Sequence, residues 1–187
     1  MAIRARGPFL SVVAVVLAAR LVSADEPSRP APAPRFPNAD KAHWIGTPAT
    51  WESLRGRVVL LDVWTFGCIN CVRTIPWVND VARGYADRGL SVVGIHTPEL
   101  APERVRSSVE AEVRKRGLLF PHLLDNDYAY WKALDNQYWP SIYLVDRCGR
   151  IRARAIGEVH AGEASGRRLE AQIEMLLGET PDSCGPP

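Results

Sequence analysis

The chain lacks the features that mark several common classes of protein. It has no internal repeat, which excludes a repeat array, and it has no second CxxC pair and no HxxxH pair to complete a structural zinc site. Its formal net charge of +2 gives no electrostatic reason to expect nucleic-acid binding. The first 24 residues hold three arginines and no acidic residue, so the rest of the chain has a formal net charge of −1. We therefore expect no metal centre and no nucleic-acid partner.

A long hydrophobic run is also missing. The N-terminal apolar stretch, residues 9–19, ends at Arg20 and falls short of the roughly 20 residues that span a membrane. Two arginines precede it, and Val22-Ser23-Ala24 follows with small side chains that suit signal peptidase. We expect residues 1–24 to be a cleaved signal peptide and the protein to be periplasmic or secreted. An uncleaved membrane anchor is the alternative.

Composition divides the rest of the chain. Five prolines mark residues 25–42 as an extended linker, followed by one domain over 43–180 and a tail over 181–187. Apolar runs predict strands, and amphipathic stretches between glycine and proline signals predict helices. The expected strands are 58–63, 91–95, 118–124, 141–145 and 150–156, and the expected helices are 50–54, 71–88, 102–116, 128–134 and 163–177. This order predicts an α/β sandwich with a mixed sheet.

The spacing of two cysteines gives the strongest chemical signal. Cys68-Ile69-Asn70-Cys71 follows a buried strand and opens a helix. The unpaired N–H groups and the dipole of a helix N-terminus favour a thiolate, and the second thiol lies about one turn away. CxxC is also half of a zinc site, but the strand–CxxC–helix context favours redox chemistry. The pair is therefore predicted to exchange disulfides.

Two further cysteines, Cys148 and Cys184, lie outside any CxxC setting. Four cysteines allow three pairings, and spacing makes Cys68–Cys71 the easiest to form. The remaining two would then form a structural disulfide. Two unpaired thiols, or an intermolecular bond, are the alternatives.

The segment around the CxxC resembles the active site of the thioredoxin superfamily. Trp64-Thr65-Phe66-Gly67-Cys68-Ile69-Asn70-Cys71 is followed by Pro76, and Tyr138-Trp139-Pro140-Ser141 precedes a strand as the family's cis-proline loop does. His96-Thr97-Pro98-Glu99 and Leu124-Asp125-Asn126-Asp127-Tyr128 are similar to exported thioredoxin-like redoxins of the TlpA and DipZ type. The resemblance implies a three-layer sandwich, with a mixed central sheet flanked by helices and an inserted helix–strand segment.

The resemblance also implies roles for individual residues. Cys68 would be the exposed nucleophile and Cys71 the buried resolving thiol. Pro140 would be cis and would place the backbone of Trp139 against a bound disulfide or peptide. Trp64 and Trp139 would shape an apolar rim around the sulfurs.

Three polar residues are further candidates. Asp62 matches the position of thioredoxin's buried carboxylate, and with a pKa raised by burial it could accept the Cys71 proton. An acid that points outward or meets a hydrogen-bond donor is the alternative. His96 and Glu99 stand at the end of a central strand, where ligands gather, although such residues are more often structural.

Departures from the family pattern bear on the exact activity. The cytochrome-c-maturation branch often carries Glu where this chain has Thr74, which weakens that assignment. A peroxidase would use the T-x-x-C of Thr65 to Cys68, but Leu61 replaces the proline of the peroxiredoxin motif. A copper-binding assembly protein would join a CxxxC pair to a distant ligand such as His160, but the spacer here has two residues.

The leading hypothesis is an exported thiol–disulfide oxidoreductase that needs no cofactor. A thiolate on Cys68 would attack a substrate disulfide, or the oxidised pair would accept electrons from thiols. The expected partners are protein or small-molecule thiols and disulfides, with a membrane electron-transfer protein as a candidate donor.

Overall fold

A six-stranded sheet organises the part of the chain that the computed structural model describes, residues 30–37 and 40–180. The strands are β1 (Trp44–Ile45), β2 (Val58–Trp64), β3 (Leu90–His96), β4 (His122–Leu124), β5 (Ser141–Val145) and β6 (Ile151–Ile156). The α-helices are α1 (Ile69–Gly84), α2 (Arg106–Lys115), α3 (Ala129–Ala133) and α4 (Ala164–Gly178). Three short 3₁₀ helices are η1 (Lys41–His43), η2 (Ala86–Arg88) and η3 (Ala101–Arg104).

The sheet is mixed, with the strand order β1-β4-β3-β2-β5-β6. Strands β2, β3 and β4 run parallel, whereas β5 is antiparallel to β2, β6 to β5, and β1 to β4. Every residue of the central strand β2 is buried, as its continuous apolar run predicts for a strand covered on both faces. The predicted α/β class with a mixed sheet is confirmed.

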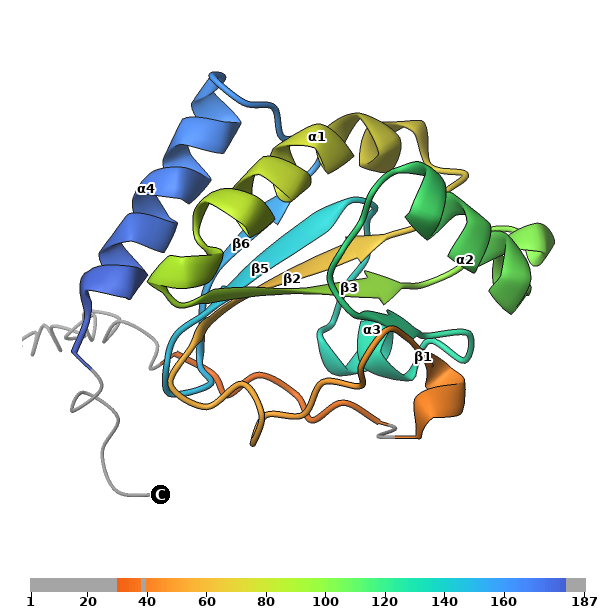
Figure 1. The fold of residues 1–187 in the computed structure, drawn as a ribbon, viewed down its shortest axis with the longest axis horizontal. Helices are drawn as coiled ribbons and strands as arrows, with labels where there is room; N and C mark the ends of the chain where they lie inside the picture. The colour runs from red at the N-terminus through yellow and green to blue at the C-terminus, as the bar shows by residue number, and fades with distance from the viewer. Residues whose placement is uncertain (1–29, 38–39, 181–187) are drawn as a thin grey trace, which may run out of the picture.

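Helices cover both faces of the sheet, which makes three layers (Figure 1). Val58 and Leu60 of β2 pack in one cluster with α1 and α4, whereas Val59 and Leu61 pack with Trp44 and α3 on the opposite face. This separation follows from the alternation of side chains along a strand. Helix α2 and strand β4 lie between β3 and β5 in the chain and supply the expected inserted segment.

Helix α1 carries the cysteines to the carboxyl end of β2. Its inward face, Ile75, Val78 and Val81, is buried, and Pro76 lies exposed inside the helix. On α4, Leu169, Ile173 and Leu176 form the buried face, and Leu177 is half-buried. Because α1 begins just beyond the end of a parallel strand, its N-terminus lies where α/β proteins commonly place their sites.

Four predicted elements differ from the structure. The predicted helix 71–88 is divided into α1, which ends at Gly84, and η2. Residues 50–54 form a turn rather than a helix. The Thr50 and Ser53 side chains bond each other's backbone N–H groups at 3.0 and 3.1 Å, as at a helix start, but Gly56 has a left-handed backbone that ends the segment after one turn. The predicted helix 102–116 is divided into η3 and α2 by Val105, whose backbone is extended. The predicted strand 118–124 is shorter, with β4 beginning at His122.

Residues 30–37 make contacts that their proline-rich composition does not predict. The backbone N–H of Ala33 donates to Gly149 at 2.8 Å, beside the start of β6. The Phe36 ring stacks on Trp51 and on Tyr130, with centroids 5.2 and 5.0 Å apart. Part of the predicted linker therefore packs on the domain, and the boundary at residue 43 stays a prediction.

Candidate active site

A disulfide joins Cys68 and Cys71 at the start of α1, with Cα atoms 5.3 Å apart. Cys68 is the N-cap of the helix, and its sulfur accepts the backbone N–H of Cys71 at 3.2 Å. Cys68 is partly exposed, whereas Cys71 is only 2% exposed. The outer sulfur therefore faces an N–H donor of the kind that favours a thiolate.

The loop before β5 approaches the same sulfurs. The Trp139–Pro140 peptide bond is cis, as the resemblance implies, and Pro140 is buried. Trp139 packs with Cys68 against the cluster that contains Cys71, and its indole N–H donates to the Thr97 carbonyl at 3.1 Å. The structure thus brings the cysteines and the cis-proline loop together from segments about 70 residues apart in the sequence.

Trp64 lies behind the sulfurs rather than on an open rim. Its side chain is 1% exposed, and its indole N–H donates to Nδ1 of His122 at 3.2 Å. His96, also buried, lies edge-on to Trp64 and has Nε2 3.3 Å from the Thr65 hydroxyl. Burial lowers the pKa of His96 to about 4 and that of His122 to about 3, so both rings are neutral at pH 7. These contacts favour a structural part for the histidines.

Asp62 lies within β2, beneath the helix that carries the cysteines. Side-chain alternation places it on the same face as Leu60, where α1 packs. Asp62 is 2% exposed, and burial raises its pKa to about 7. A carboxyl group with this pKa can take up and release a proton near neutral pH.

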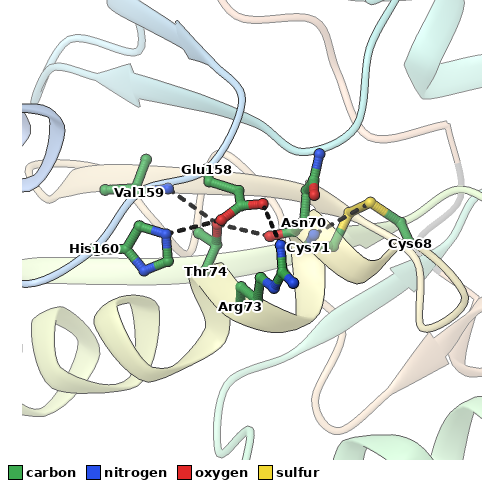
Figure 2. A network of polar contacts seen from close by, with 8 residues as sticks. All are labelled: Cys68, Asn70, Cys71, Arg73, Thr74, Glu158, Val159 and His160. Atoms are coloured by element: carbon green, nitrogen blue, oxygen red, sulfur yellow. Dashed lines mark hydrogen bonds and ion pairs between the residues drawn. A yellow bond between two sulfur atoms is a disulfide. The ribbon is translucent and has the colours of Figure 1, made fainter.

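Thr74 connects α1 to the loop between β6 and α4 (Figure 2). Its buried hydroxyl donates to the carbonyl of Asn70 at 3.0 Å and accepts the N–H of Val159 at 3.1 Å. Thr74 stands where the cytochrome-c-maturation branch often has Glu. In this chain the position therefore carries a neutral hydrogen-bonding group next to the CxxC turn.

An ion-pair group lies on the outside of the same loop. Glu158 pairs with Arg73 of α1 at 3.3 Å and with His160 at 2.9 Å. Figure 2 shows His160 on the side of Glu158 away from Cys68. His160, the candidate third copper ligand, thus contacts the carboxylate of Glu158.

Glu103, a buried carboxylate close to the CxxC turn, was not selected from the sequence. It lies in η3, is 1% exposed and accepts the backbone N–H of Gly67 at 2.7 Å. In the sequence it lies in the expected helix 102–116, with no signal that would place it at the site. Glu99, which the strand-end position did suggest, is exposed and donates its backbone N–H to Glu103.

Comparison with known protein families shows which family shares this sequence pattern. The family model described as Redoxin matches residues 30–173, more than half of the chain. The chain belongs to the Redoxin family. The resemblance to thioredoxin-like proteins inferred from the CxxC and cis-proline segments is confirmed.

Named relatives of this redoxin include proteins of very different length. Protein DipZ of Mycobacterium bovis is 44% identical over 140 residues, which cover 73% of this chain and 19% of the relative. The chain therefore spans about a fifth of that protein. Thiol-disulfide oxidoreductase YkuV of Bacillus subtilis is 28% identical over 138 residues, 73% of this chain and 89% of YkuV.

Solved structures support the same fold. A thiol-disulfide isomerase from Corynebacterium glutamicum aligns with a TM-score of 0.67 and 27% identity, covering 79% of this redoxin and 98% of that chain. A thioredoxin-like protein in its oxidized form aligns with a TM-score of 0.69 and 26% identity, covering 81% and 97%.

The remaining predictions concern residues at the edge of the described structure or beyond it. Cys148 lies in the turn between β5 and β6 and is bonded in a disulfide, but Cys184 lies outside the described residues, so that pairing stays a prediction. The predicted signal peptide, residues 1–24, is also outside them. Across residues 30–37 and 40–180, no helix has both the length and the apolar character needed to cross a bilayer. In the same ranges, no three His, Cys, Asp or Glu side chains form a group that could hold a metal ion.

Proposed function

We propose that this redoxin is a thiol–disulfide oxidoreductase that works through Cys68 and Cys71. One observation carries the proposal: the disulfide lies at the N-terminus of α1, with the outer sulfur partly exposed and the inner one buried. This asymmetry suits one thiol to attack a substrate and the other to resolve the product. The relatives named as thiol-disulfide oxidoreductases support it.

The proposed cycle begins with the reduced pair. The Cys68 thiolate attacks one sulfur of a substrate disulfide, which forms a mixed disulfide and releases the other substrate sulfur as a thiolate. Cys71 then loses its proton and attacks the Cys68 sulfur. The Cys68–Cys71 bond forms, the mixed disulfide breaks, and the substrate leaves as a dithiol carrying the two electrons. In the opposite direction the oxidised pair accepts two electrons from substrate thiols.

Asp62 is the proposed acceptor of the Cys71 proton. Its position on the α1 face of β2 and its pKa of about 7 support this role, because a strongly acidic carboxylate would be a poor proton acceptor. Trp139 and Pro140 are the proposed substrate contacts. Trp139 and Cys68 both pack against the buried cluster that contains Cys71, and Pro140 follows Trp139 through a cis peptide bond.

Insulin reduction with dithiothreitol as electron source tests the proposal. We expect Cys68→Ser to lower the rate to the uncatalysed background, because the attacking sulfur is removed. The matched control is the double variant Cys148→Ser and Cys184→Ser, which changes cysteines outside the CxxC and is expected to retain the wild-type rate. A Cys68→Ser protein as active as wild type would contradict the proposal.

Proteins are the proposed substrates, with small thiols as a second group. Ile69 and Tyr138, on the two segments that meet at the sulfurs, are 59% and 55% exposed and offer apolar area to a protein partner. A membrane electron-transfer protein is the proposed donor of electrons.

We also propose that the protein is exported. The two arginines, the apolar run 9–19 and the small residues before Asp25 support cleavage after Ala24. Intact-mass measurement of protein expressed with its full N-terminus in bacteria tests this step. A mature chain that begins at Asp25 is expected, and recovery of the uncleaved chain from the membrane fraction would favour the anchor.

A further inference from the structure

Glu103 contacts the turn that carries the cysteines through a set of buried hydrogen bonds. The side chain is 1% exposed and uses both carboxylate oxygens. Oε1 accepts from the N–H of Gly67, the residue just before Cys68, at 2.7 Å. Oε2 accepts from the N–H of Glu99 at 2.6 Å and from that of Leu100 at 2.7 Å. We call this set of three bonds the Glu103 clamp.

The bond to Gly67 goes beyond local helix capping. A glutamate at the third position of a helix commonly accepts the N–H of the N-cap residue, and the bond to Leu100 is of this kind. Gly67, however, lies 36 residues earlier in the chain. A Cβ atom at position 67 would overlap Oε1 of Glu103, so only glycine allows this close approach. The two residues are therefore fitted to each other across two separate loops.

Only an ionised carboxylate suits these three donors. It presents acceptors on both oxygens, whereas an amide presents a donor on one side. Burial by itself raises the pKa of Glu103, but the N–H groups of Leu100, Glu99 and Gly67 and the Thr65 hydroxyl outweigh burial and hold the pKa below its ordinary value. The Glu103 clamp is therefore charged and complete at neutral pH.

We propose that Glu103 is a positioning residue for disulfide exchange: by holding the N–H of Gly67, it fixes the turn that presents the Cys68 sulfur to the substrate. This inference rests on the proposed function and names a further residue on which that function depends. Thiolate attack on a disulfide requires the three sulfurs to line up, and a displacement of about 1 Å can cost about 100-fold in rate. The carboxylate acts through Gly67 and not as an acid or base.

The test compares two variants that break the Gly67 bond in different ways. Glu103→Gln keeps the size of the side chain but replaces one acceptor with a donor. Gly67→Ala keeps the charge but pushes the carboxylate away from the turn. Glu112→Gln is the matched control, because that carboxylate belongs to α2 and pairs with Lys115 and Arg116 of the same segment.

The readout is the rate of alkylation of reduced Cys68 by iodoacetamide between pH 5 and 9, with insulin reduction measured in parallel. A displaced Cys68 loses the N–H of Cys71 that favours its thiolate, so its alkylation curve moves to higher pH. We expect both clamp variants to slow alkylation at pH 7 about tenfold and to slow insulin reduction by at least as much. Glu112→Gln is expected to stay within about twofold of wild type.

Each outcome decides the inference. Slower alkylation by folded Glu103→Gln and Gly67→Ala, with circular dichroism like that of wild type, would support it. Alkylation at the wild-type rate or faster in Glu103→Gln would overturn it, because the carboxylate would then act only as a distant charge or a structural group. If Glu103→Gln does not fold, Gly67→Ala decides by the same criterion. Failure of the wild type to reduce insulin would count against the proposed function alone, since alkylation still reports the position of Cys68.

Discussion

Two buried carboxyl groups lie near the CxxC turn, and their surroundings shift their pKa values in opposite directions. Asp62, in the middle of β2, is 2% exposed, and burial raises its pKa to about 7. Glu103, in η3, is 1% exposed, yet backbone N–H groups and a hydroxyl hold its pKa below the ordinary value against the effect of burial. Between these two acids, the hydrogen-bond donors around Glu103 account for its lower pKa. One carboxyl is thereby suited to move a proton and the other to fix a backbone.

A third carboxylate near the same helix, that of Glu158, lies at the surface rather than in the interior. Glu158 lies on the outer side of α1 and pairs with Arg73 and His160, whose side chains are 58% and 35% exposed. Water competes for all three groups, so the geometry is held loosely. The three acids thus form a series from a buried carboxyl with a raised pKa, through a buried carboxylate held by N–H donors, to a surface carboxylate.

Replacing Asp62 is expected to have the largest effect on stability. The folded protein holds this proton up to pH 7, whereas the unfolded chain releases it near 3.8, so stability falls as pH rises between these values. Asp62→Asn removes that dependence and is expected to raise the free energy of unfolding at pH 8 by an amount of the order of 4 kcal/mol. Urea unfolding at pH 8 and at pH 4 measures the free energy of unfolding of both proteins. The extra stability of Asp62→Asn should be smaller at pH 4 than at pH 8. A variant less stable than wild type at pH 8 would contradict burial as the cause of the shift.

Replacing Glu103 is expected to act in the opposite sense. Its lowered pKa contributes stability that is present above the unfolded value of 4.5 and is lost as pH falls through the lower folded value. We expect Glu103→Gln to lower the free energy of unfolding at pH 7 by about 2 kcal/mol, because a buried N–H loses a charged acceptor. Urea unfolding from pH 7 to pH 3 should show the difference narrowing below pH 4.5. An equal difference at every pH would indicate that shape rather than charge is responsible.

Replacing Glu158 is expected to have the smallest effect on stability. We expect Glu158→Gln to leave the free energy of unfolding close to that of wild type, because its partners are exposed to solvent. Thermal unfolding at low and at 0.5 M salt checks this, and added salt should remove most of the difference. A loss comparable to that of Glu103→Gln would remove the contrast between the buried and the exposed carboxylate.

The parts that follow local rules could be predicted from the sequence. The apolar run of β2, the helix that begins at the CxxC and the 3–4 spacing of α4 depend on neighbours in the chain, and each was found where the pattern predicts it. The cis peptide bond before Pro140 was predicted from the resemblance rather than from local pattern.

The parts that depend on distant contacts could not be predicted in this way. From the sequence alone, Glu103 belongs to an expected helix. Only the fold shows that it contacts Gly67, 36 positions earlier in the chain. Phe36 belongs by composition to a linker, and only the fold reveals the rings of Trp51 and Tyr130 that cover it. Trp64 was expected at a rim, yet the inserted segment with His122 encloses it. In each case the deciding partner comes from another part of the chain.

Trapping the mixed disulfide tests whether Cys68 is the attacking sulfur. Cys71→Ser keeps the attacking sulfur of Cys68 but removes the thiol that resolves the mixed disulfide. After incubation with a disulfide-containing protein such as insulin, mass spectrometry should find a covalent adduct on Cys68 that dithiothreitol releases. Absence of that adduct, or an adduct of equal yield in Cys68→Ser, would show that the outer sulfur of the CxxC pair does not perform the exchange.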